Sequence, residues 1–274
     1  MQMTIPLLRC LALACLLLAV PAAWAQSYEW RDVRQHVTIA PDGTVRVQDD
    51  RTLWTSGDFG EAFICLRLAP GKRVHLLEDS GALSPGPPAH AYQGPCELGT
   101  ELVLAQDERV SERRVRFAYL LEGTVDAHAD VVQWYWNILE RDHPPVLGYE
   151  LVVEAPGPMA EPYDAFVHRY DNTEEPTVRL SQDRSRLEVS FERVPDGDGV
   201  EIRYLMDPQL FTISGRGERL LEFLEEEARL AGVAVRPGPL ESLRFWANVA
   251  VRRHWLALLL VAGSVLYLAY YIVT

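Results

Sequence analysis

The sequence predicts a mainly β protein: an exported antiparallel β-sandwich followed by a juxtamembrane helical segment and one C-terminal transmembrane helix. Three observations predict this class. The middle of the chain alternates apolar and polar residues with the period of two that a half-buried strand requires. Clusters of Pro, Asp and Gly separate these runs, as turns do. Both ends of the 274-residue chain are strongly apolar.

Residues 1–25 have the pattern of a secretory signal peptide. A single arginine precedes the apolar run Leu11 to Val20, and Ala23-Trp24-Ala25 forms a cleavage site. The run is shorter than the roughly 20 apolar residues that span a bilayer. We therefore expect cleavage, with the mature chain beginning at Gln26. An uncleaved anchor, or lipid attachment at Cys15, is the alternative.

Residues 26–212 are predicted to form the β-sandwich, because many short strands separated by turns are typical of that architecture. The alternation is clearest in three stretches: Val115, Phe117, Tyr119; Leu187, Val189, Phe191; and Val200, Ile202, Tyr204. Other strand-like runs are residues 36–40, 44–55, 62–68, 74–77, 101–106 and 147–154. Pro41-Asp42-Gly43 and residues 195–199 read as turns. The Gly- and Pro-rich stretch Ser80–Pro95 is expected to be an irregular loop.

The last part of the chain is predicted to be helical. Residues 213–253 form the juxtamembrane segment, in which leucines of residues 220–230 recur at near-helical spacing until Pro237-Gly238-Pro239 interrupts them. Residues 254–274 form the transmembrane helix. The run from Trp255 to Val273 is 19 residues without a charge, about 28 Å as a helix and close to the thickness of a bilayer core.

The signal peptide sets the predicted topology. It places the β domain outside the cytoplasm and the C-terminus inside, so the chain is expected in the cell membrane. Arg252 and Arg253 then lie on the outer side, contrary to the usual positive-inside distribution. Long exported domains translocate largely regardless of charge, so the signal decides the orientation.

Composition and motifs exclude several classes of function. The chain has 26 Lys and Arg against 39 Asp and Glu, a net charge of −13. This balance argues against a nucleic-acid partner, which a basic surface would bind. The sequence has no GxSxG, Walker or HExxH motif. No catalytic residue and no cofactor are therefore predicted.

Two clusters are candidate sites. Trp134-Tyr135-Trp136 is an aromatic group that would suit a glycan or a peptide if exposed; alternatively, the tryptophans belong to the sandwich core. Asp126, His128 and Asp130 are metal-ligand types at period-two spacing. The alternatives for them are a solvated turn or, for Asp130, bonds to nearby backbone N–H groups or an arginine.

Cys65 and Cys96 are the only cysteines of the expected mature chain. In an exported domain they are expected to form a disulfide, closing a loop of about 30 residues. The alternative for Cys65 is a buried free thiol, because it falls in an apolar strand.

Four segments resemble the N-terminal half of the domain-of-unknown-function 2207 family of predicted bacterial and archaeal membrane proteins. They are Ser27-Tyr28 with residues 41–47; residues 51–54 with 57–59; residues 117–125 with Asp130 and Trp136; and residues 200–204 with Pro208 and Phe211. The resemblance implies a signal, a β-rich exported domain and a membrane helix, with further helices in a second half. The family has no established activity, so the resemblance transfers no catalytic residue.

These observations favour a single-pass envelope protein whose acidic ectodomain binds another envelope component, either a protein or a polymer. The alternatives are a membrane-tethered hydrolase using Asp126, His128 and Asp130, and a structural subunit of a larger membrane complex. Perturbed carboxylates around a concave pocket would favour the enzyme. A flat aromatic patch would favour the binding protein.

Overall fold

The computed structural model describes residues 27–56, 61–83, 89–96, 99–106, 111–141, 143–169 and 175–230. These residues form fifteen strands, the 3-10 helix η1 (Pro208–Leu210) and the α-helix α2 (Leu220–Leu230). The mainly β class is confirmed, and α2 lies within the predicted helical segment. The predicted signal peptide and transmembrane helix lie outside the described residues.

The chain divides after Leu220 into two compact units. The first contains every described strand and is called the β domain below. Its largest sheet, the large sheet, has eight strands. In spatial order these are β13 (Thr177–Leu180), β14 (Arg186–Val194), β11 (Val146–Glu154), β1 (Ser27–Ile39), β2 (Val45–Ser56), β8 (Glu112–Glu122) and β4 (Arg73–Leu76), with β5 (Gly81–Ala82) also paired to β8.

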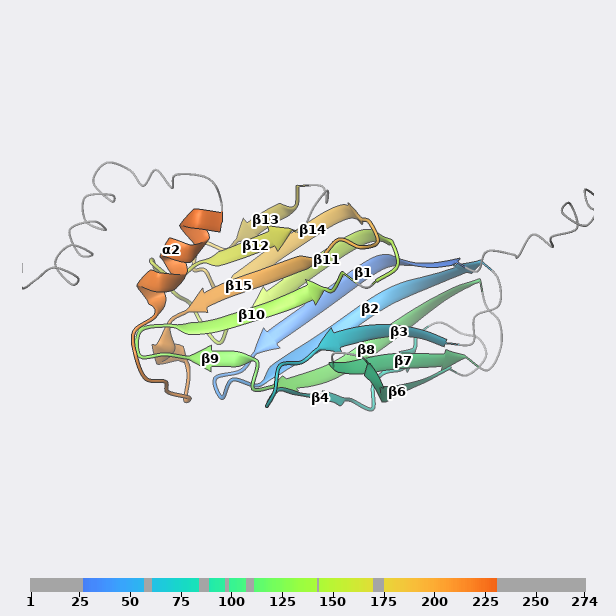
Figure 1. Cartoon of the computed structure of the whole chain (residues 1–274), viewed down its shortest axis with the longest axis horizontal. Coiled ribbons are helices and arrows are strands. Elements are labelled where there is room, and N and C mark those ends of the chain that lie inside the picture. Colours follow the sequence, from blue (N-terminus) through green and yellow to red (C-terminus); the bar gives the residue numbers. More distant parts are fainter. Residues whose placement is uncertain are drawn as a thin grey trace, which may run out of the picture. The chain divides into compact units, whose positions relative to one another are not determined.

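Two smaller sheets lie in front of the large sheet (Figure 1). The four-stranded sheet has the order β12 (Ala165–Arg169), β15 (Val200–Met206), β10 (Val132–Leu139) and β9 (Val125–Ala127). The three-stranded sheet has the order β3 (Glu61–Arg67), β7 (Gly99–Gln106) and β6 (Ala89–Cys96). One apolar cluster contains side chains from all three sheets, so the core lies between these two layers.

The alternation of the sequence explains the inward faces of the strands. In β8 the side chains of Val115, Phe117, Tyr119 and Leu121 are buried, with Arg114 and Glu122 exposed. In β14 the inward residues Leu187, Val189 and Phe191 are likewise buried. Each of the predicted strand-like runs coincides with a strand.

Two details of the sequence prediction are wrong. The sheets are not all antiparallel, because β1 and β11 run parallel from the pair Trp30 and Val146 to the pair Thr38 and Glu154. Parallel neighbours need a long connection, which here consists of the intervening strands, and alternation alone does not reveal direction. The stretch Ser80–Pro95 is not wholly irregular, because it contains β5 and most of β6. Gly94 and Pro95 are tolerated there because β6 is an edge strand.

Candidate functional site

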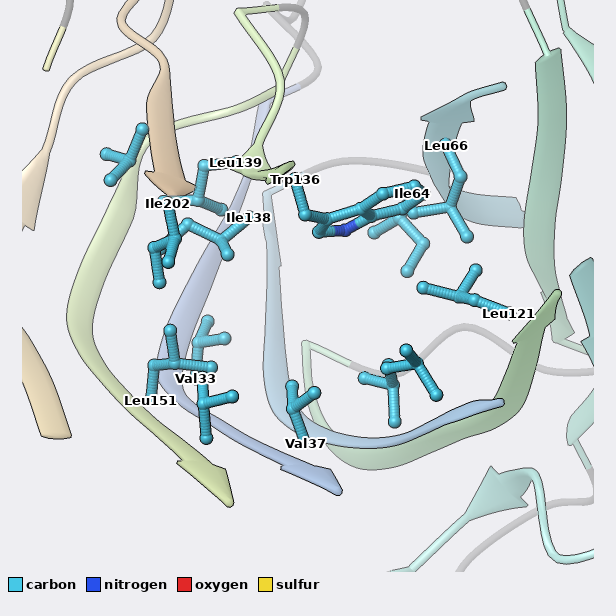
Figure 2. Packing of buried hydrophobic residues seen from close by; sticks show 14 of the residues in the cluster. Val33, Val37, Ile64, Leu66, Leu121, Trp136, Ile138, Leu139, Leu151 and Ile202 are labelled. Carbon is cyan, nitrogen blue, oxygen red and sulfur yellow. The ribbon is translucent and has the colours of Figure 1, made fainter. Parts of the chain in front are cut away.

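The predicted aromatic triplet lies on β10 and divides between its two sides. Trp134 is fully buried and Trp136 is 8% exposed, and their rings stack with centroids 6.5 Å apart. Figure 2 shows the indole of Trp136 beside Ile64 and Leu66 of the three-stranded sheet. Trp136 thus joins the two smaller sheets. Both tryptophans occupy the core, as the structural alternative predicted.

Tyr135 points away from that core. Its hydroxyl donates a hydrogen bond to Glu201, and the guanidinium carbon of Arg203 lies 4.9 Å from the centre of its ring. Nearby, Glu140 accepts hydrogen bonds from the amide of Asn137 at 3.1 Å and pairs with Arg67 at 3.3 Å. Burial raises the pKa of Glu140, and these two partners oppose the change. These groups form a polar side of the four-stranded sheet, opposite the two tryptophans.

The predicted Asp/His cluster is not brought together as a set of metal ligands. Among the described residues, no group of three or more His, Cys, Asp and Glu side chains is placed to hold a metal. Strand β9 ends at Ala127, so His128 and Asp130 lie in the following turn, and period-two spacing does not apply to them. Asp126 is exposed, whereas Asp130 is half-buried.

Asp130 instead binds the start of α2. Its Oδ1 accepts the backbone N–H of Arg219 at 2.8 Å, and both carboxylate oxygens lie 3.3 Å from the backbone nitrogen of Leu220. The first N–H groups of a helix have no partner within the helix, and a carboxylate there is favourable. Asp130 therefore has a structural role at the start of this helix. The same turn lies close to Gly215, because a Cβ on Gly215 would be 1.6 Å from the carbonyl oxygen of Ala127.

We expect Asp130→Ala to lower the free energy of unfolding by about 1 kcal/mol, the usual cost of losing a helix cap. Urea titration of the purified protein, followed by tryptophan fluorescence, measures this change. Asp126→Ala is the matched control and should change stability by less than about 0.5 kcal/mol, because Asp126 is exposed. Equal effects of the two substitutions would contradict the capping role.

Cys65 is disulfide-bonded. Its strand β3 and the strand β6, which ends at Cys96, flank β7 on its two sides. The side chain of Cys96 lies outside the described residues, so the pairing of Cys65 with Cys96 stays a prediction.

The outer side of the three-stranded sheet carries exposed aromatic residues. Phe63 is 39% exposed and Tyr92 is 43% exposed, whereas Ile64, which faces inward from β3, belongs to the core. Phe63 and Tyr92 both pair in register with Val103 of the central strand β7. The two rings therefore lie on one side of the sheet. The Cα atoms of Phe63 and Tyr92 are two strand spacings apart, or about 9.6 Å. Val103 lies between them and outside the core cluster.

Two carboxylates accompany these rings. The hydroxyl of Tyr92 donates a hydrogen bond to Glu61 Oε1 at 2.9 Å, and this bond raises the pKa of Tyr92. Glu101 lies two residues before Val103 on the same side of β7, and its charge also acts on Tyr92. We call the outward side formed by Glu61, Phe63, Tyr92, Glu101 and Val103 the aromatic face. The sequence prediction missed it.

A hollow lies on the large sheet. It has a volume of about 580 Å³ and adjoins residues of β1, β11 and β14 together with Glu175 and Thr177. It lies where β1 bulges: Asp32 has φ 46°, and Gly148 opposite it has φ 74°. Such left-handed positions suit Gly and are tolerated by Asp. The acidic residues at the hollow are Asp32, Glu150, Glu175 and Glu192, and Arg34 lies there as well and pairs with Glu150 at 3.4 Å.

A buried polar network lies next to this bulge. Arg51 is the residue of β2 opposite the two bulged residues, and its Nε and Nη2 donate to the two carboxylate oxygens of Asp49 at 2.7 Å each. Gln35 donates to Asp49 at 2.6 Å and accepts from Tyr149 at 2.5 Å. Asp49 is fully buried and Arg51 is 5% exposed. In the sequence, this network is indicated by two charged residues, Asp49 and Arg51, at inward positions of β2.

The surroundings of the network raise the pKa of both Arg51 and Tyr149. Burial disfavours the charge of Arg51, but the attraction and hydrogen bonds of Asp49 outweigh it and raise the pKa of Arg51. Burial and the charge of Asp49 raise the pKa of Tyr149 well above its usual range. Arg51 therefore stays charged beside a neutral tyrosine, and we assign the network to the support of the bulge.

Comparison with known protein families gives a match over residues 31–206, more than half of the chain, to the family described as "Predicted membrane protein (DUF2207) N-terminal domain". The chain belongs to this family. The matched residues of this DUF2207 protein include the aromatic face and most strands of the β domain. Among its described residues, no helix is both long and apolar enough to cross a membrane. The predicted span at residues 254–274 lies outside them.

Solved structures resemble this DUF2207 chain only distantly. Leukotriene A4 hydrolase from Saccharomyces cerevisiae is 10% identical, with a TM-score of 0.37, over 65% of this chain and 29% of that chain. An M1 zinc metallopeptidase from Deinococcus radiodurans is 13% identical, with a TM-score of 0.35, over 65% of this chain and 42% of that chain. The chain thus spans less than half the length of either protein. No curated protein matches it.

Proposed function

We propose that this DUF2207 protein is anchored in the cell membrane by residues 254–274 and exposes its β domain outside the cytoplasm, where the aromatic face binds another component of the cell envelope. The family description as a predicted membrane protein supports membrane association. The predicted signal peptide at residues 1–25 supports export. The disulfide bond at Cys65 also supports it, because such bonds persist in oxidising compartments.

The exposed pair Phe63 and Tyr92 is the observation that carries the binding role. Large aromatic side chains gain the most from leaving water, and they are enriched among the residues that dominate binding energy. Here two of them share one side of a hydrogen-bonded sheet, which is more rigid than a loop. A preorganised surface binds with less entropy loss than a mobile one.

The placement of the acidic residues favours binding over hydrolysis. A hydrolase at Asp126, His128 and Asp130 would need these side chains to converge on one reacting group. The carboxylate of Asp130 is instead engaged by the backbone at the start of α2. On the aromatic face, Glu61 accepts a hydrogen bond from Tyr92, so this carboxylate holds the ring of Tyr92 in place.

Co-purification tests the proposal. The intact protein is extracted in mild detergent from its own cells, and bound proteins and sugars are quantified. We expect a component that is recovered with the wild-type protein to fall at least tenfold with the double substitution Phe63→Ser and Tyr92→Ser, because loss of two contact aromatics typically weakens binding by more than 1–2 kcal/mol.

Val178→Ser is the matched control, because Val178 is 43% exposed on β13 of the large sheet, away from the aromatic face. This variant should retain the bound component. Equal recovery with the double variant and the wild type, when both are folded, would overturn the proposed role of the aromatic face.

A further inference from the structure

Arg113 is a buried cation at the start of β8. It lies on the inward side of this strand, in the same alternation as Val115 and Phe117, and is only 3% exposed. Its Nη1 and Nη2 atoms are buried and have no hydrogen-bond partner among the described residues. An arginine stays charged in proteins, so this site cannot relieve the charge by losing a proton.

The large sheet contains a second buried arginine, Arg51, whose charge is balanced by a carboxylate. Arg51 is paired on two nitrogens with the carboxylate of Asp49. That carboxylate also accepts from Gln35, so its oxygens are already in use. A buried guanidinium needs such a partner, because an uncompensated charge away from water is strongly unfavourable.

A second unmatched donor lies at the same level of the large sheet. Trp30 of β1 pairs with Leu53 of β2, and Leu53 pairs with Arg113 of β8, so the three form one row across the sheet. Trp30 is fully buried, and its indole N–H has no hydrogen-bond partner in the described part of the chain. The polar groups of this row are therefore a guanidinium and an indole N–H, and none of its three side chains can accept a hydrogen bond.

We propose that the guanidinium of Arg113 binds a small oxyanion, a carboxylate or a phosphate group, through its free Nη1 and Nη2 atoms. The two nitrogens of one guanidinium match the two oxygens of such a group. Arg113 is the second residue of β8, so the site lies near one end of this strand. This anion site is separate from the aromatic face.

Thermal unfolding of the purified full-length protein tests the site, with sodium phosphate or sodium acetate replacing sodium chloride at constant ionic strength. The wild-type Tm should rise with one of these anions and then saturate, by about 3–6 °C at ten times the Kd. The anion that acts more strongly distinguishes a phosphate from a carboxylate ligand. A wild-type Tm that is the same in all three salts would overturn the proposal.

Three variants test whether Arg113 itself binds the anion. Arg113→Met should lose the anion response and be at least as stable as the wild type in chloride, because it removes an unpaired buried charge. Arg113→Lys should bind the anion at least tenfold more weakly, because it keeps the charge but loses the planar fork. Arg114→Met, at the exposed neighbouring position, should keep the response. A full response in Arg113→Met would contradict the site.

Discussion

Replacing Trp136 with alanine is expected to lower the free energy of unfolding of the β domain by about 3–5 kcal/mol. The indole is 8% exposed, stacks on Trp134, and packs against Ile64 and Leu66 at the junction of the two smaller sheets (Figure 2). Its removal leaves a cavity in the core at this junction. Urea titration of the purified variant measures the loss, which is a large part of a typical domain's stability.

Trp54→Ala is the matched control for this result. Trp54 is half-buried on β2, and its ring has the guanidinium carbon of Arg31 at 4.7 Å. Loss of such a partly exposed ring should cost about 1 kcal/mol. If Trp136→Ala unfolds at the same urea concentration as the wild type but loses a bound component, the indole belongs to a binding site and its structural role is wrong.

Asp49→Ala is the second large effect that we expect, also about 3–5 kcal/mol. The substitution leaves the buried guanidinium of Arg51 without its carboxylate, which is the costly way to break a buried ion pair. It also removes the acceptor of Gln35 next to the bulge in β1. The same urea titration measures the change.

Two further variants separate this explanation from a general sensitivity of β2. Asp50→Ala should cost no more than about 1 kcal/mol, because Asp50 and its partner Arg116 are only half-buried and stay in contact with water. Combining Asp49→Leu with Arg51→Met should recover much of the lost stability, because the unpaired charge is gone. Asp49→Ala and Asp50→Ala variants of equal stability would show that burial of the pair has little energetic consequence.

The strands that the sequence predicted are those with clean alternation. Val115, Phe117 and Tyr119 alternate with exposed or half-buried residues, so their inward side could be read directly. β10 has no such alternation, because both of its sides are largely buried, and its tryptophans remained ambiguous between core and binding surface. The parallel pairing of β1 with β11 joins residues more than a hundred positions apart, which a local pattern does not specify.

The candidate site was harder to predict for related reasons. Residues 62–66 form an unbroken apolar run, Ala-Phe-Ile-Cys-Leu, so the sequence does not reveal that Phe63 faces outward while Ile64 faces the core. Tyr92 lies in a stretch that Gly and Pro made look irregular. The bond from Asp130 to Arg219 spans 89 residues, and only the fold brings these residues together.

Crosslinking in living cells tests whether the aromatic face is a contact surface in the envelope. A photoreactive amino acid is placed at position 63, 92 or 178 of the full-length protein, and the cells are irradiated before extraction. We expect the same higher-mass adduct from positions 63 and 92 and none from position 178, which is as exposed as Tyr92 but lies on β13. Adducts of equal yield from all three positions, or none from positions 63 and 92, would contradict a contact surface at the aromatic face.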